Sequence, residues 1–299
     1  ALSNAINMTV NPILPVSVSI SVNPGSSICA GVSITFTAVP VNGGNNPTYQ
    51  WLSNGNPIQG ETNSTYTSNQ LSDGEQISVV LTSNALCTTG NPATSNVITV
   101  TVDRNLVVSA VLDINPGATI CDGTTTTFTA IVDNGGNTPT FQWFNGANPI
   151  SGATSVTYTS ATLVTGDEIY VRVTSSEACA VGNPANSDTA DIIVNPILTV
   201  GVSISANTGN VICLGSPVTF TATPLNGGLT PFYQWFNGLN AIPGETASTY
   251  ASSTLVNGDQ ISVRLFSSEI CTTVNPVSSD GITMTVNPIV PVSVSIVSN

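Results

Sequence analysis

The 299-residue sequence predicts an all-β fold, built as a tandem array of two-layer β-sandwiches. Two observations predict it. Apolar and polar residues alternate with a period of two in many short segments, as in half-buried strands, and no helical period competes with this alternation. The sequence also matches itself almost continuously at an offset of 92 residues. A repeat of that length made of short strands indicates one sandwich domain copied in series.

The repeat divides the chain into three full units with a partial unit at each end. SNAINMTV at 3–10 matches SNVITVTV at 95–102, so residues 1–10 are expected to be the last strand of a preceding domain. NPIVPVSVSI from Asn287 repeats NPILPVSVSI from Asn11, so residues 287–299 are expected to be the first strand of a following domain. We therefore expect a segment of a longer array. Its full units are residues 11–102, 103–194 and 195–286.

Each unit is expected to contain six or seven strands, separated by turns rich in Gly, Pro and Asn such as VNGGNNP, SNGNP and SDGE. That number of short strands in 92 residues is enough for two packed sheets, as in the immunoglobulin fold. The predicted strands of the first unit are 16–21, 32–39, 48–54, 64–69, 75–83 and 96–102.

Four stretches of the first unit carry a resemblance to a known family: ICAGVSITFTA, TYQWLSNGNPIQGETNSTYT, LSDGEQISVVLTSNALC and SNVITVTVNP. They resemble the immunoglobulin-like and PKD-like repeats of large Bacteroidota surface adhesins, which include gliding-motility adhesins and other cargo of type IX secretion. The resemblance covers the whole chain and recurs in all three units. It implies an extracellular protein attached to a bacterial cell surface. It also implies O-glycosylation at Thr189, within Asp188-Thr189-Ala190.

Each unit carries one tryptophan in the motif [YF]QW, on the predicted strand 48–54 or its equivalent. An immunoglobulin-like sandwich places its core indole there. The alternative is a platform on which sugars stack. Tyrosines of the predicted strand 64–69 and its equivalents are expected in the core as well. These aromatic residues are Trp51, Trp143, Trp235, Tyr66, Tyr158 and Tyr250.

The six cysteines fall at two repeated positions, 58 residues apart within each unit. Evenly spaced cysteines in an extracellular array indicate disulfides, whereas zinc would want close CxxC pairs or histidines. Cys29, Cys121 and Cys213 precede the second predicted strand of their units, and Cys87, Cys179 and Cys271 follow the fifth.

Two disulfide pairings are open. If strands alternate in direction, Cys29 and Cys87 lie at opposite poles of one unit, roughly 30 Å apart, although a disulfide needs Cα atoms within about 7 Å. The start of the second strand does face the next unit. The staggered pairing therefore joins Cys29 to Cys179 and Cys121 to Cys271, with Cys87 and Cys213 pairing outside this chain. The within-unit pairing joins Cys29 to Cys87, Cys121 to Cys179 and Cys213 to Cys271.

Composition excludes several functions. Charged residues make up 6% of the chain, and the net charge is −13. The three basic residues are Arg104, Arg172 and Arg264, so there is no lysine, and there is no histidine. A Ser-His-Asp or Cys-His site cannot be built, so no enzyme is expected. No metal, cofactor or nucleic acid is expected, and no apolar stretch is long enough to span a membrane.

The acidic turns at 72–75, 165–168 and 257–260 raise the possibility of calcium binding. Calcium needs six to eight oxygen ligands, so one or two carboxylates per turn are more typical of hydrogen bonding within a hairpin.

The expected function is structural: a stiff, disulfide-stapled stalk segment of an adhesin or surface filament. The expected partners are neighbouring identical repeats and parallel copies of the chain. The alternative function is adhesion, with each repeat binding glycans or a surface.

Overall fold

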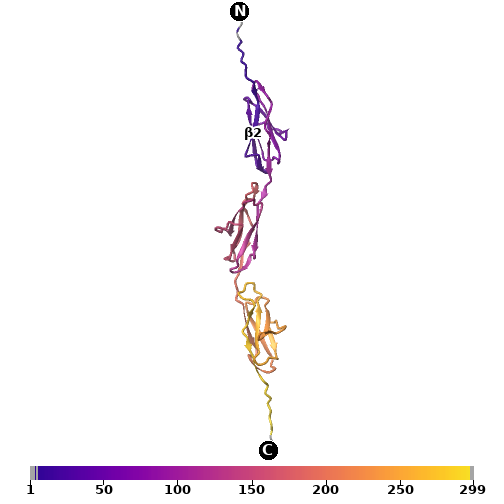
Figure 1. Ribbon diagram of the computed structural model, residues 1–299, viewed down its shortest axis with the longest axis vertical. Coiled ribbons are helices and arrows are strands. Elements are labelled where there is room, and N and C mark those ends of the chain that lie inside the picture. Colours follow the sequence, from indigo (N-terminus) through magenta and orange to yellow (C-terminus); the bar gives the residue numbers. More distant parts are fainter. Residues whose placement is uncertain (1–3, 5, 297–299) are drawn as a thin grey trace.

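The computed structural model describes residue 4 and residues 6–296. Across this part of the chain the secondary structure is entirely β, with no helix. Figure 1 shows three bodies in a row, joined end to end, with the two termini at opposite ends of an elongated molecule. The predicted all-β, tandem immunoglobulin-like fold is confirmed. No helix in residues 4 and 6–296 is long and apolar enough to cross a membrane.

Each body, called unit 1, 2 or 3 in chain order, pairs two antiparallel sheets. In unit 1 the smaller sheet has the order β2 (Ser17–Asn23), β4 (Ile34–Val41), β7 (Thr65–Ser68). The larger sheet has the order β10 (Ala93–Thr94), β8 (Gln76–Thr82), β5 (Thr48–Ser53), β6 (Asn56–Pro57), with β11 (Ile98–Thr99) also paired to β8.

Units 2 and 3 repeat this topology. Their smaller sheets are β14 (Ser109–Asn115), β16 (Thr126–Asp133), β19 (Thr157–Ser160), and β25 (Gly201–Ala206), β27 (Val218–Leu225), β30 (Thr249–Ser252). The larger sheet of unit 2 comprises β18 (Asn148–Pro149), β17 (Thr140–Asn145), β20 (Glu168–Thr174), β22 (Ala185–Asn186) and β23 (Ala190–Asp191). That of unit 3 comprises β29 (Asn240–Ala241), β28 (Phe232–Asn237), β31 (Gln260–Phe266), β32 (Val277–Ser278) and β33 (Ile282–Thr283).

Short parallel pairs lie outside the two sheets and hold the cysteine-bearing segments. Those that bring the last strand of a unit beside a cysteine are β12 (Thr101–Asp103) with β3 (Ser27–Cys29), β24 (Ile193–Asn195) with β15 (Thr119–Cys121), and β34 (Thr285–Asn287) with β26 (Val211–Cys213). Those that bring the entering strand beside the other cysteine position are β1 (Leu14–Pro15) with β9 (Thr88–Thr89), β13 (Leu106–Val107) with β21 (Ala180–Val181), and the bridge Leu198 to Thr272.

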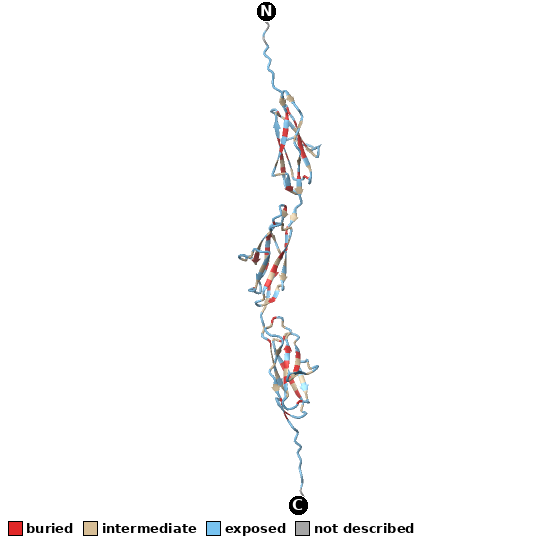
Figure 2. Ribbon diagram, in the orientation of Figure 1, coloured by how far each residue is buried: buried red, intermediate tan, exposed pale blue. Residues whose placement is uncertain are grey.

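Each unit has its own hydrophobic core, seen in Figure 2 as red stripes inside each body. The tryptophan is fully buried in every unit. In unit 2, Trp143 packs against Phe128 and Tyr158 at ring-centroid distances of 6.1 and 5.9 Å. Its indole Nε1 donates a hydrogen bond to the carbonyl oxygen of Ser155 at 2.9 Å. The same triad and indole bond recur in units 1 and 3, so the core is built identically three times.

The last strand of each unit is not continuous, although the alternation at 96–102 predicts one strand. In unit 1 this range holds two short strands, β11 and β12, and a third, β10, lies just before it. Two polar side chains interrupt the backbone ladder: Ser95 Oγ accepts from the amide of Val79 at 3.0 Å, and Asn96 Oδ1 accepts from the amide of Ile20 at 2.9 Å. After this interruption β11 pairs with β8 again, with Ile98 opposite Ile77, and β12 continues to the far pole, where it pairs with β3.

Candidate functional site: the disulfide-bonded junctions

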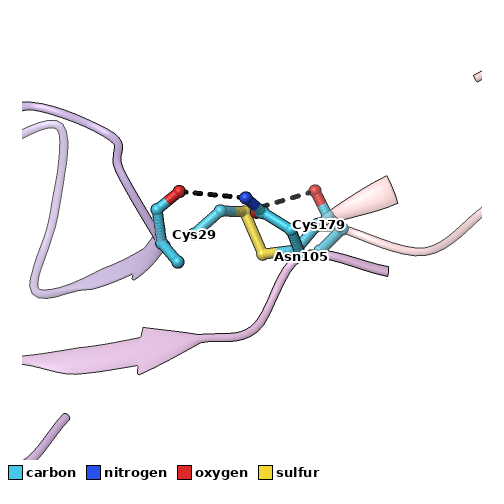
Figure 3. Close-up of a disulfide and its surroundings, with 5 residues drawn as sticks. Cys29, Asn105 and Cys179 are labelled. Carbon is cyan, nitrogen blue, oxygen red and sulfur yellow. Dashed lines mark hydrogen bonds between the residues drawn. A yellow bond between two sulfur atoms is a disulfide. The ribbon is translucent and has the colours of Figure 1, made fainter. Parts of the chain in front are cut away.

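Two disulfides connect successive units. Cys29 of unit 1 is bonded to Cys179 of unit 2, with a Cα–Cα distance of 5.4 Å (Figure 3), and Cys121 of unit 2 is bonded to Cys271 of unit 3 at 5.5 Å. Both bonds span 150 residues of sequence. This is the staggered pairing, and none of the within-unit bonds is present in the described part of the chain.

The first junction is positioned from the unit 1 side by the last strand of that unit. β12 runs parallel to β3, with Asp103 opposite Cys29. The amide of Ala30 donates to the carbonyl oxygen of Asp103 at 2.9 Å. Cys29 is therefore held at the pole where the chain leaves unit 1, which is the reason it faces unit 2 and not Cys87.

The same linker is anchored on unit 2 immediately afterwards. The amide of Leu106 donates to the carbonyl oxygen of Cys179 at 2.9 Å, and the amide of Val108 donates to that of Val181 at 3.0 Å. Asn134, in the loop between β16 and β17, donates from Nδ2 to the carbonyl oxygen of Val107 at 2.7 Å. Only Arg104 and Asn105 lie between the segments fixed on unit 1 and on unit 2. The junction is therefore short and tightly held.

One linker side chain is bonded to the segment that carries Cys29. Asn105 donates from Nδ2 to the carbonyl oxygen of Ala30 at 3.2 Å (Figure 3). The Sγ atom of Cys29 lies 3.6 Å from the carbonyl oxygen of Ala178. A disulfide sulfur carries no hydrogen, so we treat this second approach as a van der Waals contact and not as a hydrogen bond.

The second junction repeats the backbone geometry with different side chains. The amide of Asp122 donates to Asn195 and that of Leu198 to Cys271, both at 2.9 Å. A shallow cavity beside each disulfide has equivalent lining: Asp103, Arg104, Leu106, Glu177, Ala178 and Cys179 at the first junction, and Asn195, Pro196, Leu198, Glu269, Ile270 and Cys271 at the second. Glu177 has a charged counterpart, Glu269, but Asp103 and Arg104 are replaced by Asn195 and Pro196, so the feature common to both junctions is the covalent tie together with one glutamate.

The remaining two cysteines, Cys87 and Cys213, are exposed and unbonded among the described residues. Cys87 lies beside β1, where the amide of Leu14 donates to its carbonyl oxygen at 2.8 Å. Cys213 ends β26, opposite Asn287 of β34. Each therefore occupies one half of a junction like the two that are bonded.

The acidic turns use their carboxylates internally. In unit 1, Glu75 accepts from the amide of Ser72 at 2.8 Å and from Ser53 Oγ at 2.6 Å. In unit 2, Asp167 accepts from the amide of Val164 at 2.9 Å. No group of three His, Cys, Asp or Glu side chains placed to hold a metal occurs in residues 4 and 6–296. These contacts are those of hairpin turns.

Thr189, the residue of the O-glycosylation expectation, is exposed, and the preceding Asp188 accepts from the amide of Leu112 at 3.2 Å. Among the titratable groups, burial raises the pKa of Tyr233, a core residue of unit 3. Neither residue belongs to a junction.

Sequence reasoning missed the asparagines that anchor the linkers. Asn42, Asn134 and Asn226 each have a positive φ and donate from Nδ2 to a carbonyl of the entering strand. The signal was present, because each begins an Asn-Gly-Gly motif that recurs every 92 residues. A repeated Asn-Gly-Gly predicts a turn, but only the fold shows which carbonyl lies within reach of the amide.

No protein-family model matches the chain. The chain is 28% identical, over 173 residues, to the highly immunogenic outer capsid protein of Enterobacteria phage T4. That match covers 56% of this chain and 46% of the relative, so it spans less than half the relative's length.

Among solved structures, the three N-terminal domains of the bacteriophage RB49 highly immunogenic outer capsid protein align with 91% of this chain and 99% of that one, at 16% identity and a TM-score of 0.38. The Ig1–Ig3 ectodomain of mouse nectin-like molecule 4 aligns with 89% of this chain and 98% of that one, at 12% identity and a TM-score of 0.33.

Proposed function

We propose that this chain is a structural rod, a stalk segment that transmits tension along an extracellular filament or surface protein. The observation that carries the proposal is that two covalent connections cross each junction, the linker backbone and a disulfide. The linker backbone is present in any chain of successive units, but units that only had to fold would not need the disulfide. In addition, the linker is fixed to both units by backbone hydrogen bonds, which restricts bending at the junction.

The staggered bonds limit how far the chain extends if its units unfold under load. The shortest covalent route from residue 1 to residue 299 runs forward to Cys29, across to Cys179, back to Cys121, across to Cys271 and on to the end. It contains about 114 peptide steps of the 298 in the chain. At about 3.3–3.6 Å per step, the bonded chain reaches roughly 400 Å and the reduced chain roughly 1000 Å.

Pulling single chains by their termini tests this function. We expect the oxidised chain to stop extending near 400 Å, and the reduced chain to extend about two and a half times further, because reduction opens both loops. Cys29→Ser with Cys121→Ser, which removes both bonds, is the matched variant and should behave like the reduced chain. If oxidised and reduced chains extended equally far, the proposed function as a disulfide-limited rod would be contradicted.

The proposed setting is an exposed surface outside the cytoplasm. Disulfides persist in oxidising surroundings and are rare in the cytosol. The phage relative is by its name an outer capsid protein, and the repeats resemble those of bacterial surface adhesins. Attachment to a bacterial cell surface, with gliding motility and type IX secretion, is the more specific form of the proposal and is supported by that resemblance alone.

A second candidate function, adhesion by individual units, is favoured by one surface cluster. The guanidinium of Arg172 lies 4.9 Å from the ring centroid of Phe144, which stacks on Tyr170 at 4.9 Å. Arg264 lies over Phe236 in the same way in unit 3. Arg172 and Arg264 are exposed, whereas Phe144 is only 9% exposed, so the cluster offers chiefly its guanidinium cations to a ligand such as an acidic sugar.

A glycan array probed with the oxidised chain separates the two functions. A rod without adhesive activity should give no signal above background. Adhesion through the cluster predicts binding that Arg172→Ala with Arg264→Ala abolishes, while Arg104→Ala, outside the cluster, leaves it intact. Glycan binding unaffected by the double variant would exclude this cluster as the adhesive surface.

A further inference from the structure

We propose that unit 3 carries a binding site for neutral sugar chains, formed by an apolar patch that units 1 and 2 do not have. The patch consists of four exposed residues, Leu229, Phe232, Phe266 and Ile270. The proposal goes beyond the rod function, since it gives one unit of the rod a binding activity. It is argued from the comparison of three copies of one sheet topology.

An aromatic pair at the centre of the patch replaces a threonine pair of the other two units. Phe232 on β28 lies opposite Phe266 on β31, with ring centroids 5.5 Å apart. The same register position holds threonine pairs in the other units, Thr48 with Thr82 and Thr140 with Thr174. Units 1 and 2 form the same sandwich with these threonines, so the fold does not require the two phenylalanines.

The loop residues of the patch differ between the units as well. Leu229, in the loop before β28, stands where units 1 and 2 have Asn45 and Asn137. Ile270, in the loop after β31, stands where unit 2 has Ala178, whereas unit 1 has a leucine. Among the three described units, unit 3 alone is apolar at all four positions.

The patch leaves a large apolar area in water. Phe232 and Phe266 are 49 and 37% exposed, because they point away from the core that Trp235 fills, and Leu229 and Ile270 are 100 and 85% exposed. Large apolar side chains have on the order of 150–200 Å² of surface each, so the patch exposes roughly 400–500 Å². An apolar patch of that size on a soluble domain is often a binding surface.

Polar groups converge beside the patch in a hollow of about 350 Å³, which is lined by Gly228, Leu229, Thr230, Ser268, Glu269 and Ile270. Thr230 and Ser268 lie two residues beyond the aromatic pair on the two chain segments, and the amide of Thr230 donates to Ser268 Oγ at 3.1 Å. The hollow therefore adjoins the aromatic rings. Sites for small ligands commonly combine an apolar wall with a few polar groups in this way.

The two loops that form the hollow are held together before any ligand binds. The amide of Ser268 donates to the carbonyl oxygen of Gly227 at 3.0 Å. A side chain at Gly228 would collide with Ser268, so the loops are in direct contact. The Cys121–Cys271 bond fixes the same pole of unit 3 to unit 2. A site that is ordered in advance loses less entropy when a ligand binds.

The chemistry of these groups fits a neutral pyranose. The face of an aromatic ring is electron-rich, and a pyranose with equatorial hydroxyls presents its C–H bonds to such a face. Among the described residues that line the hollow, only Glu269 is charged, and its carboxylate accepts hydrogen bonds from sugar hydroxyls but repels acidic sugars. The guanidinium of Arg264 lies over Phe236, four residues along β28 from Phe232. An uncharged ligand is therefore favoured at the aromatic pair.

A second copy of the chain fits the patch less well than a sugar does. A stable protein interface buries about 800 Å² on each partner, which is well above the area that the patch offers. A sugar ring needs only the area of the aromatic pair to stack. The proposal therefore assigns the patch to a sugar chain.

Affinity gel electrophoresis tests the site, with hydroxyethylcellulose as the neutral probe and polygalacturonate as the acidic one. The oxidised chain should be retarded by hydroxyethylcellulose and not by polygalacturonate. Phe232→Thr with Phe266→Thr gives unit 3 the threonine pair of units 1 and 2 and should lower the affinity by roughly tenfold or more, because the stacking surface is lost. Hydrogen exchange of β28 and β31 should show that the variant remains folded.

A graft into unit 2 is the matched control, because that unit already has the polar residues of the hollow, Thr138, Ser176 and Glu177. The graft carries Asn137→Leu, Thr140→Phe, Thr174→Phe and Ala178→Ile. Added to the Phe232→Thr, Phe266→Thr chain, it should restore the retardation by hydroxyethylcellulose. A folded graft that restores none of it would contradict the assignment of binding to the patch.

Three other results would overturn the proposal. They are an absence of retardation by hydroxyethylcellulose, retardation that the double threonine variant leaves unchanged, and retardation by polygalacturonate alone. Sedimentation of the unmodified chain as a dimer that the double variant abolishes would also overturn it, since the occupant would then be a second copy. The pulling experiment does not involve the patch, so each of these results leaves the rod function untouched.

Discussion

Cleavage of the oxidised chain after Arg104 should leave its three units joined, and only reduction should separate them. Arg104 is exposed in the linker between β12 and β13, whereas Arg172 and Arg264 lie within β20 and β31, the central strands of their sheets. Limited trypsin treatment should therefore cut first at Arg104. Because Cys29 is bonded to Cys179 across the cut, the nicked protein should run at full size on a non-reducing denaturing gel.

The reduced sample should show residues 1–104 as a separate fragment of about one third of the 30.5 kDa chain. Cys29→Ser removes the crossing bond and should release that fragment without reductant. Cys121→Ser is the matched control, because it breaks the other disulfide and leaves Cys29–Cys179 intact. Release of the fragment from the unmodified, oxidised chain would show that the bonds lie within units.

Trp143→Ala should lower the free energy of unfolding of unit 2 by about 3–5 kcal/mol, while units 1 and 3 keep their stability. Removal of a buried tryptophan costs about 3–5 kcal/mol, and a unit of 92 residues is stabilised by about 5–14 kcal/mol in total. Trp143 is fully buried and its indole bond to Ser155 is lost as well. Hydrogen exchange of β17 and β20 should accelerate strongly, by about two orders of magnitude or more for a loss of 3 kcal/mol.

Ile131→Ala is the control in the same unit, since Ile131 is 56% exposed on β16, the strand that also carries Phe128. Ile131→Ala should lower the free energy of unfolding of unit 2 by only a small fraction of the loss caused by Trp143→Ala. Exchange in units 1 and 3 should be unchanged by either variant, because each unit has a separate core. Equal acceleration in all three units would mean that the junctions couple their unfolding.

The fold was predictable because each unit repeats a period-two pattern around one tryptophan, and β2, β4, β5, β7 and β8 fall within a few residues of predicted strands. The broken last strand was not predictable from that pattern. Asn96 looks like an exposed residue of a strand, and only the packed sheets show that its side chain replaces a backbone partner of Ile20. Side chains that bond to the backbone leave the hydrophobic alternation unchanged.

The repeat spacing of the cysteines left two disulfide pairings open, and strand direction and length favoured the staggered one because they place Cys29 and Cys87 at opposite poles. Choosing between them needed the parallel pairs β3–β12 and β13–β21, which fix where each cysteine meets the linker. Pairs of two or three residues carry no sequence signal of their own. For the same reason Asn105 and Asn134 could not be assigned to the junction in advance.

The separation of 150 residues between bonded cysteines constrains the order in which this chain matures. A chain that emerges from its amino end presents Cys29, then Cys87 and Cys121, before Cys179 exists. If disulfides formed as fast as the chain emerged, Cys29 would bond to Cys87 or Cys121 and not to Cys179. Cys29 therefore has to remain a free thiol on a folded unit 1 until unit 2 has also folded and placed Cys179 beside it.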